Sequence, residues 1–272
     1  MACVGRAAKP VGAAAAKSVA CAANRRTGIA RAMTAVIVIP ARMASARLPG
    51  KPLADIGGRP MIAWMVELAR AAGAGPVLVA AAEEVIAAAA RIAGANVALT
   101  DPALPSGSDR VHAGLEAFDP AHRFDVVVNL QGDMPTMRAE DIARAVAALR
   151  PGADIATLVS PSTSQSDRDN PNVVKTILAE DGRCLAFTRA PAPWGEGPVM
   201  RHVGIYVFRR DALARFVAAK PSPLELREKL EQMRALELGM TIVAEGIADF
   251  PKGVDSPADL DAARRLLAER SP

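Results

Sequence analysis

Three cationic side chains lie within ten residues, directly after an apolar run. The run at 36–39 (VIVI) is β-branched and ends at a proline, and Arg42, Arg47 and Lys51 follow it with no acidic residue among them. Such a run predicts a buried parallel strand, and open α/β sheets bind ligands beyond the carboxyl ends of their strands. Cations on a loop that contains serine and glycine suit a triphosphate. A solvated basic loop is the alternative.

The two common phosphate-binding signatures are absent from the sequence. Gly50 and Lys51 are followed by Pro52 rather than by Ser or Thr, so a GxxxxGK[ST] loop cannot form there. Gly73 and Gly75 lack the third glycine of a dinucleotide fingerprint and lie between a predicted helix and a predicted strand, which is the wrong order. The cationic loop is therefore the predicted phosphate-binding site.

A second group of residues, which could bind a metal ion, follows another apolar run. The run at 125–130 (DVVVNL) predicts a buried strand that leads into Gln131, Gly132 and Asp133. A carboxylate in this position can bind Mg²⁺, because hard cations prefer oxygen ligands. Asp255, in the segment KGVDSP, is a candidate for a second carboxylate. The alternatives are a structural turn for Asp133 and a helix cap for Asp255.

Two further segments carry polar groups. The turn at 105–110 (PSGSDR) leads into a predicted helix, whose free amides and serine hydroxyls could contact a base edge or an anion. An ordinary N-cap is the alternative there. The segment at 201–206 (RHVGIY) alternates as a strand, which puts His202, Gly204 and Tyr206 on one face. A solvent-facing polar face is the alternative for that strand.

Strand and helix signals alternate from residue 35 onwards. The alternation predicts an α/β fold with a doubly wound, mainly parallel (Rossmann-like) sheet. Strands that follow one another between residues 173 and 208 predict a small mixed-sheet subdomain. The expected helices cover 60–72, 83–93, 108–118, 138–149, 224–238 and 256–268. The expected strands after the first cover 76–80, 96–99, 125–130, 154–160, 173–178, 184–188, 202–208 and 240–244. With no linker in sight, residues 34–272 are expected to form one domain.

The net charge of +4 is concentrated at the start of the chain. Residues 1–33 contain six basic residues and no acidic one, so the rest of the chain has 27 basic and 29 acidic residues and a net charge of −2. Nucleic acid is therefore not an expected partner. The segment 1–33 is expected to be a disordered basic extension. It is either a targeting segment or the product of an upstream start codon, with translation beginning at Met33.

Other features of the composition concern the compartment. No uncharged apolar run reaches ~18 residues, so neither a membrane span nor a membrane partner is predicted. Two of the three cysteines lie within residues 1–33, which leaves Cys184 alone and excludes a disulfide framework in the rest of the chain. The three histidines are too far apart for a zinc site. A reducing, cytoplasmic setting is expected.

The exact amino-acid sequences of these motifs are more specific than the types of side chain they contain. The chain contains, in this order, PARMASARLPGKPLADIGGRPMI, NLQGDMP, NPNVVK, RHVGIYVFRRDAL, SPLELREKLEQMRALE and GVDSPADL. Together these resemble the CMP-Kdo synthetases, the 3-deoxy-manno-octulosonate cytidylyltransferases of lipopolysaccharide synthesis. The resemblance covers residues 34–267. It implies a fold of the nucleotide-diphospho-sugar transferase type, a homodimer, Mg²⁺ as cofactor, and CTP and the keto-sugar acid Kdo as substrates.

The resemblance also implies a role for each matching residue. The CTP phosphates are assigned to the opening loop, through Arg42, Ser45, Arg47 and Lys51. The cytosine end is assigned to Ser106, Gly107 and Arg110. The metal is assigned to Asp133 and Asp255. The implied catalytic set is Arg42, Lys51, Asp133 and Asp255. The keto-sugar acid pocket is assigned to Gln131, Arg189, His202, Tyr206, Glu225 and Gln232.

The chain departs from the family pattern at three positions that bear on the site. Ala81 and Ala82 stand where the family usually has Thr-Asp, and Met134 stands where it usually has Glu after QGD. The loss of two carboxyl groups near a metal–nucleotide site could weaken metal binding or change the sugar. A cytidylyltransferase for another keto-sugar acid or surface polysaccharide sugar, and a non-catalytic nucleotide-binding paralogue, are therefore the alternative functions.

Overall fold

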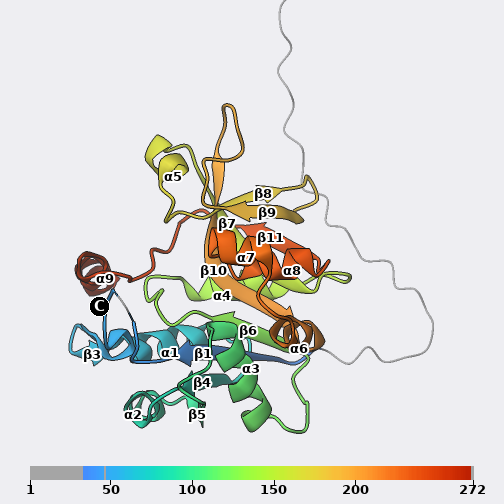
Figure 1. Cartoon of the computed structure of the whole chain (residues 1–272). Coiled ribbons are helices and arrows are strands. Elements are labelled where there is room, and N and C mark those ends of the chain that lie inside the picture. The colour runs from blue at the N-terminus through green and yellow to red at the C-terminus, as the bar shows by residue number, and fades with distance from the viewer. Residues whose placement is uncertain (1–32, 46, 271–272) are drawn as a thin grey trace, which may run out of the picture. The chain divides into compact units, whose positions relative to one another are not determined.

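The computed structural model describes residues 33–45 and 47–270, and the expected disorder of residues 1–32 lies outside this part. One sheet dominates the described part of the chain (Figure 1). Its strands are β1 (Ala35–Ala41), β4 (Val77–Ala81), β5 (Asn96–Leu99), β6 (Val126–Leu130), β7 (Ile155–Ser162), β8 (Lys175–Leu178), β9 (Cys184–Thr188), β10 (Val199–Arg209) and β11 (Ile242–Gly246). The order is β11-β7-β10-β6-β1-β4-β5, and β8 pairs with both β10 and β9.

The sheet is mainly parallel. β1 pairs in parallel with β4 and with β6, β4 pairs in parallel with β5, and β7 pairs in parallel with β11. β10 runs antiparallel to both β6 and β7, and β8 and β9 form an antiparallel pair beside it. The expected doubly wound, mainly parallel sheet with a small mixed-sheet subdomain is therefore confirmed.

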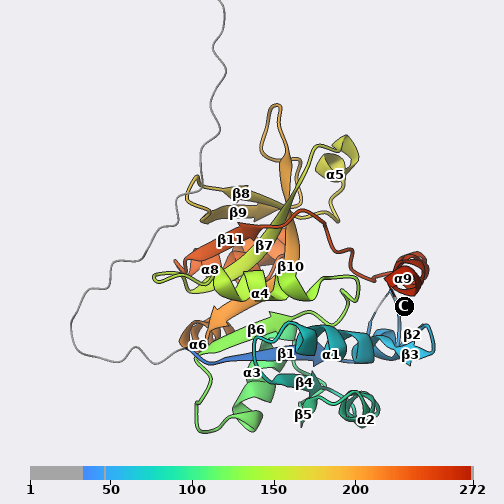
Figure 2. The same ribbon diagram turned by 180° about the vertical axis from the view of Figure 1, so that it is seen from behind.

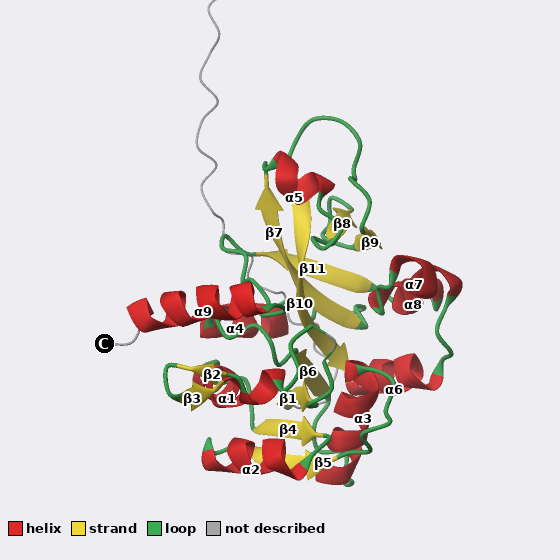
Figure 3. Cartoon of the chain, turned by 60° about the vertical axis from the view of Figure 1, so that its left-hand side comes forward, coloured by secondary structure: helices red, strands yellow, loops and turns green. Residues whose placement is uncertain are grey.

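Helices cover both faces of the sheet (Figure 3). One face carries α1 (Met61–Ala71), α2 (Glu84–Ile92) and α4 (Ala139–Ala147), and the other carries α3 (Gly107–Phe118), α6 (Arg210–Ala218), α7 (Pro223–Glu228) and α8 (Gln232–Glu237). The view from behind shows α4 and α1 in front of the strands and α9 (Pro257–Arg270) beyond the edge of α1 (Figure 2). No helix in the described residues is long and apolar enough to cross a membrane.

The first strand shows why this arrangement follows from the sequence. Ile37 and Ile39 pack into the core under α1, α2 and α4, whereas Val36 and Val38 pack into the core under α3 and α6. All four side chains have no exposed surface, as expected for a parallel strand that is covered on both faces. Each face of β1 thus needs apolar residues, which gives a continuous apolar run instead of an alternating one.

The expected helix at 224–238 is wrong, because the chain forms two short helices there. α7 ends at Glu228, its C-cap Lys229 has a left-handed φ of 55°, and α8 begins at Gln232. The break turns the chain so that Arg234 donates to both carboxylate oxygens of Glu225, over 2.7 and 2.6 Å. A bidentate pair of this kind is a tertiary contact, so helix periodicity does not reveal it.

Several smaller elements were not expected. They are the 3₁₀ turn η1 (Lys51–Leu53), the strands β2 (Asp55–Ile56) and β3 (Arg59–Pro60), α5 (Gln165–Asp169) and α6. The last strand, β11, also begins two residues later than expected. The closing helix is confirmed, with Ser256 as its cap: the Asp259 amide donates to Ser256 Oγ over 3.2 Å.

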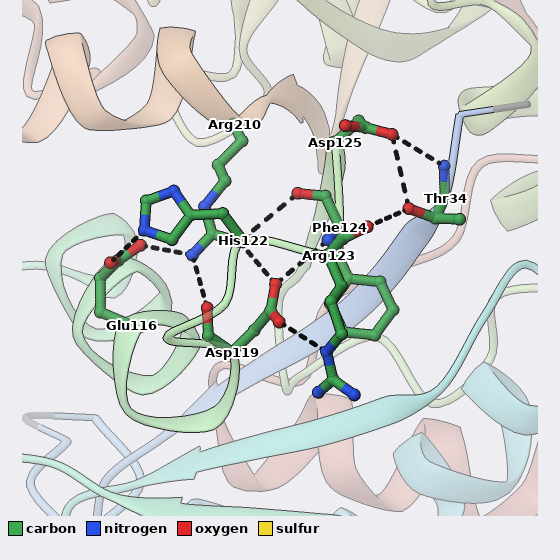
Figure 4. Close-up of polar contacts among 8 residues, drawn as sticks. All are labelled: Thr34, Glu116, Asp119, His122, Arg123, Phe124, Asp125 and Arg210. Atoms are coloured by element: carbon green, nitrogen blue, oxygen red, sulfur yellow. Dashed lines mark hydrogen bonds and ion pairs between the residues drawn. The ribbon is translucent and has the colours of Figure 1, made fainter. Parts of the chain in front are cut away.

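A polar cluster closes the sheet at the end where β1 and β6 begin (Figure 4). Asp119, which has no exposed surface, accepts hydrogen bonds from Arg123 Nε (2.9 Å), the Phe124 amide (3.1 Å) and Arg210 (2.6 Å). Burial alone would raise the pKa of Asp119, but the hydrogen bonds lower it to about 2. Arg210 also contacts Glu116 over 2.7 Å. This end lies opposite the sequence-predicted loops, so the cluster is a structural one.

Candidate active site

A cavity of about 360 Å³ opens at the carboxyl ends of β1 and β6, beside the first turn of α3. This is the edge at which parallel α/β sheets place their ligands. The cavity is lined by Pro40, Ala41, Arg42, Ala44, Ser45, Arg47, Lys51, Pro52, Ser106, Gly107, Arg110, Gln131, Gly132, Asp133 and Asp255. The structure thus brings together every residue that the sequence assigned to the phosphate, cytosine and metal ends of the site, and Gln131 of the sugar end.

The cationic loop is shaped by a backbone turn and one carboxylate. Gly50 has a φ of 73°, a conformation that favours glycine, and its amide donates to Met43 O over 3.1 Å. The Met43 amide in turn donates to Glu83 Oε2 over 3.0 Å. Arg42 and Arg47 are exposed at the pocket, whereas Lys51 is largely buried beneath them. The loop therefore offers cations at two depths.

Lys51 lies between the two candidate metal carboxylates. Its Nζ donates to Asp133 Oδ2 over 2.9 Å and to Asp255 Oδ1 over 3.1 Å, so the two oxygens are at most about 6 Å apart. Burial would lower the pKa of Lys51, but the two carboxylates more than offset this and raise it. Arg47 contacts the other oxygen of Asp255 over 3.1 Å. The Val254 amide donates to Asp133 O over 2.8 Å, which ties the two loops together.

The donor chemistry of this pair fits Mg²⁺. Both carboxylates face one cationic position, and each is partly exposed, with 30% of the Asp133 side chain and 43% of the Asp255 side chain accessible. Among the described residues there is no group of three or more His, Cys, Asp or Glu that could hold a metal. Mg²⁺ is usually held by one or two carboxylates together with substrate phosphates and water. Two carboxylates beside a cationic loop meet the protein's part of that requirement.

The first turn of α3 forms the next wall of the cavity. Ser106 is the N-cap, as the alternative interpretation expected, because its Oγ accepts from the Asp109 amide over 3.2 Å. It lines the cavity at the same time, together with Gly107. Arg110 is almost fully buried and donates to Thr100 Oγ1 (2.6 Å). Burial and the nearby charge of Arg42 lower the pKa of Arg110.

Gln131 is held by a chain of buried polar groups that the sequence did not single out. Its Nε2 donates to Asn129 Oδ1 over 2.8 Å, Asn129 Nδ2 donates to Ser108 Oγ over 3.3 Å, and Ser108 Oγ donates to Glu231 Oε2 over 2.9 Å. Burial raises the pKa of Glu231, against the hydrogen bond from Ser108. One signal in the sequence could have revealed this chain: Asn129 is the only amide in the apolar run DVVVNL.

The predicted sugar residues on β10 lie on the face expected for them. The ring of His202 contacts those of Tyr206 and Phe187, with centroids 5.3 and 5.1 Å apart, and its Nε2 lies 3.0 Å from Thr157 Oγ1. Burial lowers the pKa of His202 to about 3. The solvent-facing alternative is wrong for His202, because only 9% of the residue is exposed. Gly204 faces Gln131 and Met134, so this strand adjoins the cavity.

Of the predicted sugar residues only Gln131 lines the main cavity: His202 and Tyr206 do not, and neither do Arg189, Glu225 and Gln232. The guanidinium of Arg189 donates to three carbonyl oxygens, those of Glu228 (2.8 Å), Pro171 (2.8 Å) and Lys229 (3.2 Å). Gln232 is buried at the start of α8. Glu225 is bound by Arg234 but also lines a shallower depression of about 370 Å³ that shares Ser106 with the main cavity. The roles of all six predicted sugar residues stay predictions.

The positions that depart from the family pattern are apolar for a structural reason. Ala81 has no exposed surface at the end of β4, and Ala82 is almost fully buried. Met134 is also buried and lies against Gly204. Glu83 follows these alanines directly and supplies a carboxylate to the cationic loop at Met43.

Comparison with known proteins gives a consistent result. A family model described as cytidylyltransferase matches residues 36–242. A 3-deoxy-manno-octulosonate cytidylyltransferase of Parvibaculum lavamentivorans is 56% identical over 241 residues, which cover 87% of this chain and 93% of that protein. The enzyme of the same name from Rhodospirillum centenum is 54% identical over 242 residues, with 87% of this chain and 94% of that protein covered.

Solved structures agree with these relatives. The structure of a CMP:2-keto-3-deoxy-manno-octonic acid synthetase complexed with CTP superposes with a TM-score of 0.82 at 35% identity, covering 88% of this chain and 100% of the other. A cytidylyltransferase from Leptospira borgpetersenii superposes with a TM-score of 0.59 at 16% identity, covering 88% of each chain. At that identity the second likeness shows the fold alone.

Proposed function

The chain belongs to the 3-deoxy-manno-octulosonate cytidylyltransferase family, and on that premise we infer that it transfers CMP from CTP to Kdo. The products are CMP-Kdo, for lipopolysaccharide synthesis, and pyrophosphate. The observation that carries this function is the meeting of Lys51 with Asp133 and Asp255 in a cavity that the cationic loop also lines. Cationic side chains and a pair of carboxylates at one edge of the sheet suit a nucleoside triphosphate with its metal ion.

The reaction needs positioning and charge stabilisation more than a reactive side chain. The anomeric hydroxyl of the sugar attacks the α-phosphorus in line, the bond to the β-phosphate breaks, and pyrophosphate leaves. Negative charge grows on the leaving and non-bridging oxygens, and we assign its stabilisation to Arg42, Arg47 and Lys51. Asp133 and Asp255 would hold Mg²⁺, which supplies further charge neutralisation on the phosphates when bound.

The remaining residues divide between the base and the sugar. Ser106 and Gly107 stand at the N-terminus of α3, where unpaired amides and a hydroxyl can contact the cytosine. Gln131 borders the same cavity and is proposed to contact the sugar with His202 and Tyr206 of β10.

The other proposed sugar residues need a rearrangement before they can act. Arg189 would have to exchange carbonyl partners for the carboxylate of the sugar acid, a bidentate contact that guanidinium makes well. Glu225 and Gln232 lie in the same layer, in α7 and at the start of α8. Movement of the α7–α8 segment toward Ser106 would bring Glu225 and Gln232 nearer to the cavity.

Two broader features complete the proposal. The family resemblance supports a homodimer, which light scattering of the purified chain would test. Use of CTP, together with the unpaired buried thiol of Cys184, supports action in the cytoplasm. Fractionation of the native host would test that placement.

Pyrophosphate release by the purified protein with Mg²⁺, CTP and Kdo is the direct assay. Asp133→Ala should reduce turnover at least 10²-fold, since it removes a carboxylate at the reacting phosphates, with an unchanged circular dichroism spectrum. Asp211→Ala is the matched control, because Asp211 is an exposed carboxylate of α6 outside this cavity. Release with a different sugar acid only would favour the alternative substrate. CTP binding without release for any sugar acid would favour a non-catalytic paralogue.

A further inference from the structure

An amide in the middle of an otherwise apolar strand needs an explanation. Asn129 has no exposed surface, and its neighbours along β6 are Val126, Val127, Val128 and Leu130. A buried amide is costly unless its groups are hydrogen-bonded. Asn129 meets this condition by joining Gln131 at the cavity to Ser108 of α3. It therefore connects the cavity to the interior behind it.

The direction of each hydrogen bond in the series Gln131–Asn129–Ser108–Glu231 can be worked out by starting at Glu231. Ser108 Oγ donates its single proton to Glu231 Oε2 over 2.9 Å. Ser108 Oγ must then accept from Asn129, which turns the amide nitrogen of Asn129 toward it. The reverse orientation would leave the oxygens of Asn129 and Ser108 facing each other with no proton between them.

The same logic extends to the cavity. Because Asn129 presents its oxygen to Gln131, the amide nitrogen of Gln131 is committed to that contact over 2.8 Å. This contact fixes the orientation of the amide, so the carbonyl oxygen of Gln131 points away from Asn129, while one N–H of its NH2 group is used. Gln131 lies against Gly107, where an added Cβ would approach both amide atoms at 3.5 Å. Gly107 and Gln131 are thus neighbours in the wall of the same cavity.

We propose that Ser108 and Asn129 are positioning residues that fix the amide of Gln131, so that its carbonyl oxygen accepts a hydrogen bond from a hydroxyl of the sugar substrate. This inference rests on the proposed function, because it concerns the sugar end of the same cavity. Neither residue lines the cavity, and the hydrogen bonds connect each of them to it through Gln131. The hydroxyl of Ser108 is the link that a mutation can remove with the smallest change in volume.

The test compares Ser108→Ala with Ser108→Thr, which retains a hydroxyl. Ser108→Ala should raise the KM for Kdo about tenfold, the change that one lost hydrogen bond produces, and should leave the KM for CTP within about twofold. Ser108→Thr should restore most of the affinity for Kdo. Ser160→Ala is the control, since Ser160 is a buried hydroxyl of β7 that also makes two hydrogen bonds, donating to Ala248 O and accepting from Arg201, and neither involves the Gln131–Asn129–Ser108–Glu231 series. It should lose comparable thermal stability without the selective defect.

A double-mutant cycle separates positioning from a general loss of stability. If Ser108 acts through Gln131, Ser108→Ala should have no further effect on the KM for Kdo in a Gln131→Ala background. Unchanged kinetics in Ser108→Ala, equal losses for CTP and Kdo, or full additivity with Gln131→Ala would each overturn the inference. Absence of pyrophosphate release by the unmodified protein would instead refute the proposed function, so the two failures are distinguishable.

Discussion

Lys51 holds the position between two carboxylates that a metal ion would also favour. In the described structure its Nζ contacts Asp133 over 2.9 Å and Asp255 over 3.1 Å, and only 16% of its side chain is exposed. A divalent cation that approaches the two carboxylates must therefore compete with an ammonium group already there. Lys51→Met removes the charge while keeping most of the length of the side chain. This substitution should strengthen metal binding to the free protein and weaken catalysis.

The size of the first effect follows from the contacts. A hydrogen bond to a charged group contributes about 1.5–3 kcal/mol, and the contact with Asp255 counts less because 43% of that side chain is exposed to solvent. The two contacts together oppose a competing cation by about 3 kcal/mol. Lys51→Met should therefore tighten Mg²⁺ binding by roughly 100-fold, at 1.4 kcal/mol for each factor of ten.

The second effect has the opposite sign. When CTP is bound, Lys51 is proposed to contact its phosphates, where charge grows in the transition state. Removing one such donor typically costs 10²–10³-fold in kcat. Turnover of Lys51→Met should fall by about that factor, even at Mg²⁺ concentrations that saturate the variant.

Calorimetric titration of Mg²⁺ into the nucleotide-free protein measures the first effect, and pyrophosphate release measures the second. Lys220→Met is the matched control, since Lys220 is an exposed lysine that lines none of the cavities described above. It should change neither quantity. An unchanged or weaker Mg²⁺ affinity in a folded Lys51→Met variant would refute the competition between ammonium and metal. Unchanged turnover would refute the phosphate role of Lys51.

Two further predictions concern stability and pH. Asp119→Asn should lower the free energy of unfolding by about 3 kcal/mol at pH 7 because it leaves Arg210 without its buried partner, whereas Asp261→Asn, in an exposed pair, should cost less than about 1 kcal/mol. The pKa of Asp119 is below its unfolded value, so the difference from wild type should disappear as pH falls from about 4 toward 2, and a constant difference in urea melts would contradict this. The pKa of His202, about 3, also lies below its unfolded value of about 6.5. Between these two pH values the unfolded chain binds more protons than the folded one, so the free energy of unfolding decreases as the pH is lowered. When the pH is lowered from 7 to 4, the free energy of unfolding of His202→Gln should therefore decrease by about 3 kcal/mol less than that of the wild type. If denaturant titrations gave the same pH dependence for both proteins, the buried neutral ring would be refuted.

The sequence predicted the parts of the site that depend on local pattern. The run at 36–39 identifies a strand covered on both faces, and a loop after such a strand must lie at the ligand-binding edge. Lys51, Asp133 and Asp255 could each be proposed because each follows or precedes a recognisable element. Their meeting at one nitrogen could not be predicted, since it joins segments 82 and 204 residues apart.

Other features depend on contacts that no local pattern encodes. The break between α7 and α8 follows from the pairing of Glu225 with Arg234, while the residue spacing alone suits one continuous helix. Asn129 stands out in its strand, but its role depends on Ser108 and on Glu231, which is about a hundred residues further along the chain. Polar residues in apolar elements are thus visible in a sequence, while their partners are not.

The departures from the family pattern gain a physical meaning from the packing. Gly114 of α3 lies so close to β4 that an added Cβ would come within 2.6 Å of the Cβ of Ala80, and the sheet edge beyond it continues as buried Ala81 and Ala82. A carboxylate at position 82, where the family pattern has Asp, would be almost fully buried and would need a partner of its own. Glu83, directly after these alanines, is half-buried, and its carboxylate accepts a hydrogen bond from the Met43 amide. Met134 is likewise buried, so neither departure removes a carboxylate from the position that Lys51, Asp133 and Asp255 share. The changes therefore bear on the shape of the loop and of the sugar end, and the metal and phosphate chemistry is expected to be retained.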